Sequence, residues 1–158
     1  MRVPATRRVQ PGLVLSERAL NRALLGRQML LQRSPIAAAA AIDHLVGLQA
    51  QAPSSPYIAL WSRLEGFEPG HIAEALEQRQ AVRMALMRGT LHLVSAEDGL
   101  RLRPLLQSVQ DRAWRTSPYA RALAGLDVQS VLLAGRQLLE QRPRTPAEVG
   151  KVLAERFP

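Results

Sequence analysis

Residues 81–94 read AVRMALMRGTLHLV, and this stretch decides the fold. Between residues 81 and 87 every second side chain is Val, Met or Leu, which is the period of a β-strand. Residues 90–94 are rich in β-prone types. Arg88-Gly89 lies between the two segments and supplies turn chemistry. We therefore predict a β-hairpin of two strands.

Helix start signals lie upstream of this hairpin. Ser16 is a candidate N-cap, while Ser34-Pro35 and Ser55-Pro56 each combine a capping hydroxyl with a first-turn proline. Apolar residues at helical spacing follow each signal. We predict helices over residues 17–32, from 35 through 48, over 56–64, and from Pro69-Gly70 onward. Helices followed by a hairpin are typical of a winged helix-turn-helix, an α+β module that commonly binds DNA.

Two glutamines stand between the second and third predicted helices. Pro53 disfavours helical backbone in the residue before it, so we expect an extended segment from Gln49. An extended chain has a period of two, which directs Gln49 and Gln51 to one side and Ala50 inward. The result is a pair of uncharged amides on one face. Such a pair can take part in chemistry, or it can simply solvate a loop.

The second half of the chain is helical. Ser95 and Asp127 are candidate N-caps, and Thr145-Pro146-Ala147-Glu148 combines an N-cap, a first-turn proline and a capping-box acid. The order of helix, turn and capped helix repeats the beginning of the first module. We therefore divide the chain into a flexible basic arm (residues 1–12), a winged-helix DNA-binding and catalytic module (13–106), a helical linker (107–126) and an incomplete second winged-helix module (127–158).

Composition narrows the function classes. The 158 residues are 47% hydrophobic and 22% charged, and no apolar run is long enough to span a bilayer. No apolar core follows the basic first ten residues, so they do not form a secretion signal. We therefore expect a cytoplasmic protein without a membrane partner. The absence of cysteine excludes disulfides, cysteine-ligated zinc and thiol catalysis. The net charge of +8 comes almost entirely from arginine. It fits a nucleic-acid partner, and it equally fits the codon bias of a GC-rich genome.

Generic catalytic motifs are absent from the sequence. There is no glycine-rich phosphate loop and no nucleophile elbow, and the three histidines are too scattered to ligate a metal. We expect neither a metal nor another cofactor. His44 and His71 are interpreted as structural or solvated. Arg88, Thr90 and His92 alternate on one side of the hairpin, either as a polar stripe beside DNA or as a solvated outer face, which periodicity alone favours.

Four segments in order resemble a known family. They are residues 15–22 (LSERALNR), 47–51 (GLQAQ), 55–64 (SPYIALWSRL) and 87–94 (MRGTLHLV). Together they resemble the AlkZ-like winged-helix DNA glycosylases over roughly residues 13–106, with weaker similarity onward. The resemblance implies a bacterial base-excision enzyme of tandem winged helices, which releases N7-alkylated purines and unhooks interstrand crosslinks. Members of the family are much longer than this chain.

The resemblance also implies site residues. The catalytic motif of the family is a glutamine, one intervening residue, and a glutamine or aspartate, and it falls on Gln49 and Gln51. The glutamine at the second position is similar to the crosslink-unhooking branch. We expect DNA contacts from residues within the matched segments: Ser55, Arg63, Arg88, Thr90 and His92. The implied partner is damaged double-stranded DNA, and the full-length protein is expected to be a monomer. Tyr57 and Trp61 are interpreted as core rather than base-stacking residues.

The chemistry of two glutamines can be argued from the residues. An amide is not a general base near neutral pH, so Gln49 and Gln51 suit only a leaving group that needs little help. An N7-alkylated purine is such a group because it already carries positive charge. The amide oxygens could hold a water and stabilise an oxocarbenium-like transition state. The rival interpretation is a noncatalytic winged-helix DNA-binding or regulatory protein, and a third is a degenerate protein that folds but does little.

Overall fold

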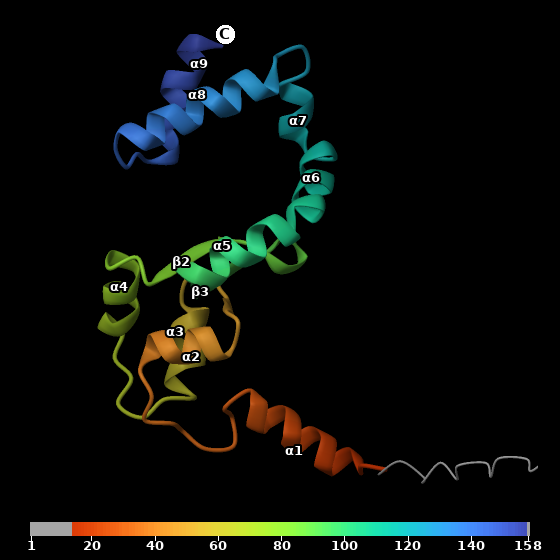
Figure 1. Ribbon diagram of the computed structural model, residues 1–158, viewed down its shortest axis with the longest axis vertical. Coiled ribbons are helices and arrows are strands. Elements are labelled where there is room, and N and C mark those ends of the chain that lie inside the picture. Colours follow the sequence, from red (N-terminus) through yellow and green to blue (C-terminus); the bar gives the residue numbers. More distant parts are fainter. Residues whose placement is uncertain (1–13, 158) are drawn as a thin grey trace, which may run out of the picture. The chain divides into compact units, whose positions relative to one another are not determined.

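The computed structural model describes residues 14–157. The basic arm predicted for residues 1–12 lies outside the described residues. The chain divides into two compact units, and the boundary in the sequence falls between Leu106 and Gln107. Each unit is described by itself (Figure 1).

The first unit combines helices with a small antiparallel sheet of three strands in the order β1-β3-β2. Its elements are α1 (Glu17–Arg27), α2 (Ala38–His44), β1 (Leu48–Gln49), α3 (Ser55–Trp61), α4 (Gly70–Glu77), β2 (Ala81–Ala85), β3 (Leu91–Ser95) and α5 (Ala96–Leu105). The predicted α+β class with a winged-helix arrangement is confirmed.

The hairpin predicted from residues 81–94 is present as β2 and β3. Its register places Met84 opposite His92 and Val82 opposite Val94. The turn is a short 3-10 segment in which Arg88 and Gly89 have φ of 56° and 71°. The left-handed conformation suits the glycine and is tolerated by Arg88 in a tight turn. The prediction of a two-stranded sheet was incomplete, because β1 pairs with the other edge of β3.

Helices cover both faces of the sheet. Ile42 of α2 and Leu60 of α3 pack with Leu48 and Leu93 on one face, where they form the hydrophobic core. Figure 1 shows α5 running across β2 and β3 on the other face. Gly99 permits this close approach, since a β-carbon there would lie 3.0 Å from Val82 Cγ1 and 3.1 Å from Met84 Sδ. The central strand β3 is therefore covered on both sides.

The first two helices are shorter than predicted. The helix predicted over residues 17–32 ends at Arg27, because the chain reverses at Met29 (φ 55°), whose side chain packs against the core. The second begins at Ala38 rather than residue 35. Ser34 instead forms a parallel bridge with Leu64, in which the Ser34 amide donates to the Arg63 carbonyl at 2.8 Å. That helix ends at His44 instead of continuing to residue 48.

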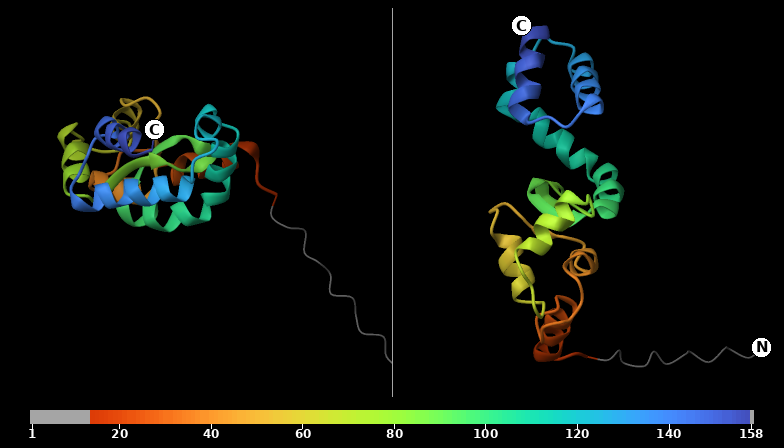
Figure 2. Two further views of the ribbon diagram at one scale, coloured as in Figure 1. Left: turned by 90° about the horizontal axis from the view of Figure 1, so that it is seen from above. Right: turned by 90° about the vertical axis from the view of Figure 1, so that its left-hand side faces the viewer.

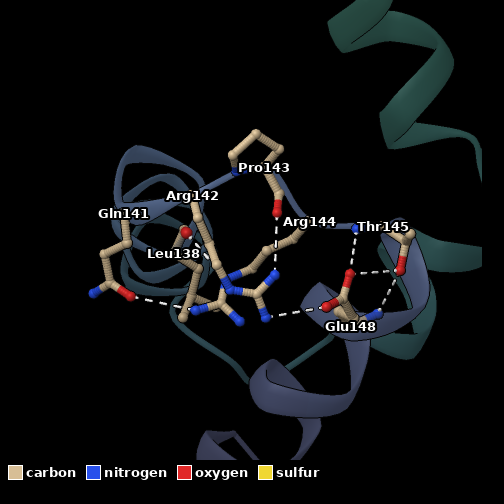
Figure 3. A network of polar contacts seen from close by, with 7 residues as sticks. All are labelled: Leu138, Gln141, Arg142, Pro143, Arg144, Thr145 and Glu148. Carbon is tan, nitrogen blue, oxygen red and sulfur yellow. Dashed lines mark hydrogen bonds and ion pairs between the residues drawn. The ribbon is translucent and has the colours of Figure 1, made fainter.

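The second unit is entirely helical in its described part. It contains α6 (Gln107–Arg115), α7 (Pro118–Ala122), α8 (Val128–Gln141) and α9 (Pro146–Arg156), and α8 and α9 lie side by side (Figure 2). The capping box predicted at residues 145–148 is confirmed. Glu148 accepts from the Thr145 amide at 2.7 Å, and Thr145 Oγ1 accepts from the Glu148 amide (Figure 3).

The second unit buries little apolar surface. Ala134 is the one buried hydrophobic residue of its described part, and α8 leaves several leucines exposed. These are Leu132, Leu133 and Leu139. Among residues 14–157, no helix is both long and apolar enough to cross a membrane.

Candidate active site

The two glutamines lie at the edge strand of the sheet. β1 comprises only Leu48 and Gln49, and the chain continues in extended form to Ala50. Ala50 is 1% exposed, whereas Gln49 and Gln51 are exposed. This alternation follows the period of an extended strand. Both glutamines are therefore exposed next to a residue that is held in the core.

The chain leaves the sheet between the two glutamines. The Ala50 amide still donates to the Leu91 carbonyl at 2.8 Å. In a regular antiparallel ladder the Leu91 amide would return a bond to the Ala50 carbonyl. Here the Leu91 amide donates instead to Oε1 of Gln51 at 3.2 Å. The Gln51 side chain thus replaces a backbone bond of the ladder and is fixed against β3.

Arg83 binds the Ala50 carbonyl oxygen, which the Leu91 amide leaves without a bond. Its Nε and Nη2 donate to the Ala50 oxygen at 3.0 and 2.9 Å. Arg83 belongs to β2, so its side chain reaches across β3 to the far edge strand. No sequence motif singled out Arg83. Its one signal is a charged residue with alanine two positions away on either side, Ala81 and Ala85, which leaves space on the sheet for a long side chain.

His92 lies where neither sequence interpretation placed it. It is 5% exposed, so it is neither part of a solvated outer face nor of an exposed polar stripe. The physical reason is that β1 and β2 pair with the two edges of β3, while α5 and α2 pack against it from the two faces. Its Nδ1 lies 2.9 Å from the Thr90 carbonyl oxygen. Because a carbonyl only accepts, Nδ1 carries the proton and Nε2 is the unprotonated nitrogen of the neutral ring.

Gln49 and His92 are cross-strand partners. The ladder hydrogen bond from the Ala50 amide to the Leu91 carbonyl belongs to the next pair. Gln49 and His92 therefore form a non-hydrogen-bonded pair, in which side chains approach most closely. Both side chains project to the same face of the sheet. Within the described residues the Gln49 amide has no hydrogen-bond partner. The site therefore contains one fixed amide, one free amide and one imidazole.

The remaining candidates at the hairpin lie near its turn. Arg88 is exposed in the turn itself, and Thr90 is half-buried beside it. The Thr90 hydroxyl donates to the Met87 carbonyl at 3.2 Å and so closes the turn. Because the Thr90 carbonyl also accepts from His92, the turn and the site share one rigid segment. Arg88 is the exposed cation that this segment carries.

Arg63 and Ser55 lie around the opposite elements. Nε of Arg63 donates to the Gln28 carbonyl at 2.8 Å, and Nη1 donates to the Ala59 carbonyl at 2.9 Å. These bonds tie the end of α1 to the end of α3, and burial lowers the pKa of the guanidinium, which remains charged. Ser55 opens α3 and is half-buried. The structure does not bring Arg63 to the glutamines through any contact.

The two aromatic residues of α3 differ in environment. Tyr57 packs against the core as predicted. Trp61 is 56% exposed, so its assignment to the core was wrong, and the Arg33 guanidinium lies 4.3 Å from its ring centre.

No group of three or more potential metal-ligating side chains of His, Cys, Asp or Glu occurs among residues 14–157.

Comparison with known proteins assigns the family. A family model described as "DNA glycosylase AlkZ-like" matches residues 42–158. The chain belongs to the AlkZ-like DNA glycosylase family. The match includes the glutamine motif and the whole second unit, and it begins after the first of the four resembling segments. The AlkZ-like likeness thus extends beyond residue 106, where we expected only weaker similarity.

The fold is also that of a solved structure. Streptomyces sahachiroi DNA glycosylase AlkZ superposes with a TM-score of 0.57 at 22% identity, over 72% of this chain. The chain spans 30% of the length of that protein. This likeness shows a shared fold. No curated relative matches the chain.

Proposed function

We propose that this chain carries the catalytic centre of a DNA glycosylase that hydrolyses the N-glycosidic bond of cationic, N7-alkylated purines, including those joined in interstrand crosslinks. The observation that supports this proposal is the built geometry around the family motif. Gln49 and Gln51 are exposed on either side of the buried Ala50, and Arg83 fixes the carbonyl between them. A solvating loop would not need such fixation.

The neutral amides limit the substrate class. Neither Gln49 nor Gln51 can donate a proton strongly enough to assist a poor leaving group. A purine alkylated at N7 departs as a neutral base, because the electron pair of the breaking bond cancels its positive charge. What the site must supply is a positioned water and acceptor oxygens near the developing positive charge on the sugar. The side-chain oxygen of Gln49 has no competing partner in the described chain, so we assign it the position closest to the developing charge on the sugar.

The charge of the chain and an exposed cation beside the site support the proposed binding of DNA. The net charge of +8 favours a polyanion, and Arg88 extends from the hairpin turn next to the segment that holds His92. The proposed partner is damaged duplex DNA, contacted at its phosphates by Arg88 and by the neighbouring hydroxyl of Thr90. Such an enzyme works at the nucleoid in the bacterial cytoplasm.

A substrate comparison tests this proposal. The purified chain is incubated with one duplex that contains N7-methylguanine and another that contains uracil, and abasic sites are cleaved and counted. The proposal expects product from the cationic lesion alone. Product from uracil, at a similar rate, would contradict the argument from neutral amides. Release of a crosslinked N7-alkylguanine in a third duplex tests the crosslink part separately.

One observation favours the rival function of a noncatalytic DNA-binding protein. The side-chain oxygen of Gln51 already accepts a hydrogen bond from the Leu91 amide, which is a structural role. Under the rival, Gln49→Ala leaves every DNA-dependent property unchanged, and the duplex is bound without base release. Duplex binding combined with the absence of product from N7-methylguanine would favour this rival over the glycosylase.

A further inference from the structure

The glutamine pair leaves one chemical requirement unmet. When water attacks the sugar, its oxygen forms a bond to C1′ and the N-glycosidic bond breaks, with the electron pair passing to the departing base. The attacking water must also lose a proton. Neither Gln49 nor Gln51 can accept that proton near neutral pH. A side chain that accepts this proton in the transition state would therefore accelerate a reaction that these amides alone leave to the solvent.

We infer that His92 is that acceptor and acts as a catalytic general base through Nε2; this inference rests on the proposed function. His92 faces Gln49 across the strand pair, as a non-hydrogen-bonded neighbour on the same face of the sheet. A water placed between them would donate one hydrogen to the Gln49 oxygen and the other to Nε2. Its oxygen lone pair would then point away from both, toward the sugar.

The hydrogen bonds of the ring set it up for this role. Nδ1 donates to the Thr90 carbonyl at 2.9 Å, which fixes the tautomer and leaves Nε2 as the acceptor. The same carbonyl would stabilise the imidazolium that forms when Nε2 takes the proton. This is the arrangement of a base oriented by a third group. The proton then passes from Nε2 to solvent.

The burial of the ring is consistent with a nitrogen aimed at the site. The side chain is 5% exposed, and Nε2 has no hydrogen-bond partner in the described chain. Every fully buried side-chain nitrogen or oxygen among the described residues does have a partner. Nε2 therefore reaches the accessible surface, although most of the ring is covered. A histidine whose task was only packing would not need to expose this atom.

Two variants separate proton transfer from packing. His92→Gln places an amide where Nε2 was, so it can hold water but cannot take a proton, and His92→Ala opens space for added imidazole. His44→Ala is the control, because His44 is an exposed histidine outside the sheet. Circular dichroism and the affinity for the lesion-containing duplex establish that each variant folds and binds.

Single-turnover rates on an N7-methylguanine duplex give the result. We expect His92→Gln to be slower by roughly 100-fold at unchanged duplex affinity, and imidazole to accelerate His92→Ala. A wild-type rate in His92→Gln would overturn the role of His92 while base release remains. Absence of product from the unsubstituted chain would instead overturn the proposed function, and the inference with it.

Discussion

Arg83 lies on β2 and Ala50 directly follows β1, at opposite edges of the sheet, yet both Nε and Nη2 of Arg83 donate to the Ala50 carbonyl, at 3.0 and 2.9 Å. The bond spans the central strand and fixes the backbone between the two glutamines. It explains how a strand of two residues can hold side chains at a defined place. The precision of the proposed site therefore depends on a residue that does not itself face the substrate.

Replacement of Arg83 by lysine tests this dependence. Arg83→Lys keeps the charge but cannot donate from two nitrogens in a fixed plane, so we expect base release to slow by roughly tenfold. Single-turnover kinetics on an N7-methylguanine duplex measure the change. Arg121→Lys, at an exposed arginine of the second unit, is the matched control. Equal rates for both variants would show that the Ala50 carbonyl needs no such support.

The bond from Leu91 to Gln51 predicts a local change in hydrogen exchange. Gln51→Ala removes the acceptor of the Leu91 amide, which should exchange faster by roughly tenfold. Gln51→Glu retains an acceptor oxygen and should keep the protection. The Ala50 amide, which donates to the Leu91 carbonyl, is the internal control in each variant. Unchanged exchange at Leu91 in Gln51→Ala would mean that Gln51 is not fixed to β3.

Gly47 lies at a position of the first unit where a side chain would be strained and would clash with its neighbours. Its φ is 113°, and a β-carbon there would lie 2.5 Å from Val94 Cγ1. Gly47→Ala should therefore lower the free energy of unfolding by roughly 3 kcal/mol, because strain and overpacking add. Gly70→Ala meets no atom within 4 Å and should have a small effect. Chemical denaturation followed by circular dichroism compares the two, and similar midpoints would contradict the packing described around β1.

The capping box of α9 predicts acid sensitivity in the second unit. Hydrogen bonds from the Thr145 amide and hydroxyl, and then from Arg142, lower the pKa of Glu148 from 4.5 to about 2. Because the pKa of Glu148 is lowered in the folded state, its carboxylate stabilises that state at pH values above 4.5. This stabilisation is lost as the pH falls from 4.5 toward 2. Glu148→Gln should remove that pH dependence of helicity, whereas Glu155→Gln should retain it. Identical acid titrations of the two variants by circular dichroism would contradict the network in Figure 3.

Arg88 and Arg63 should respond differently to substitution. Arg88→Ala removes an exposed cation, so it should weaken duplex binding and reduce the salt slope by about one. Arg63→Ala removes three hydrogen bonds to protein groups and should chiefly lower stability. Fluorescence anisotropy across a salt series, with thermal unfolding of both variants, distinguishes these effects. A lower salt slope in Arg63→Ala at unchanged stability would place that residue at the phosphates instead.

Local patterns predicted what depends on neighbours in sequence. The hairpin followed from alternation and from Arg88-Gly89, and the caps at Ser95 and Thr145 followed from side chains that bond to amides within three residues. The extended segment at Gln49 followed from Pro53. Its pairing partner did not, because no local rule selects β3, more than 40 residues away. Burial of His92 and the reach of Arg83 both depend on that pairing, so both were missed.

One measurement tests the central claim most directly. Single-turnover release of N7-methylguanine from a duplex is compared for the unsubstituted chain, Gln49→Ala, Gln51→Ala, and Gln137→Ala, an exposed glutamine of α8 as control. We predict base release by the unsubstituted chain and by Gln137→Ala, and a rate roughly 100-fold lower in Gln49→Ala at unchanged duplex affinity. Equal rates for Gln49→Ala and Gln137→Ala, with the fold intact, would contradict catalysis by the glutamine pair.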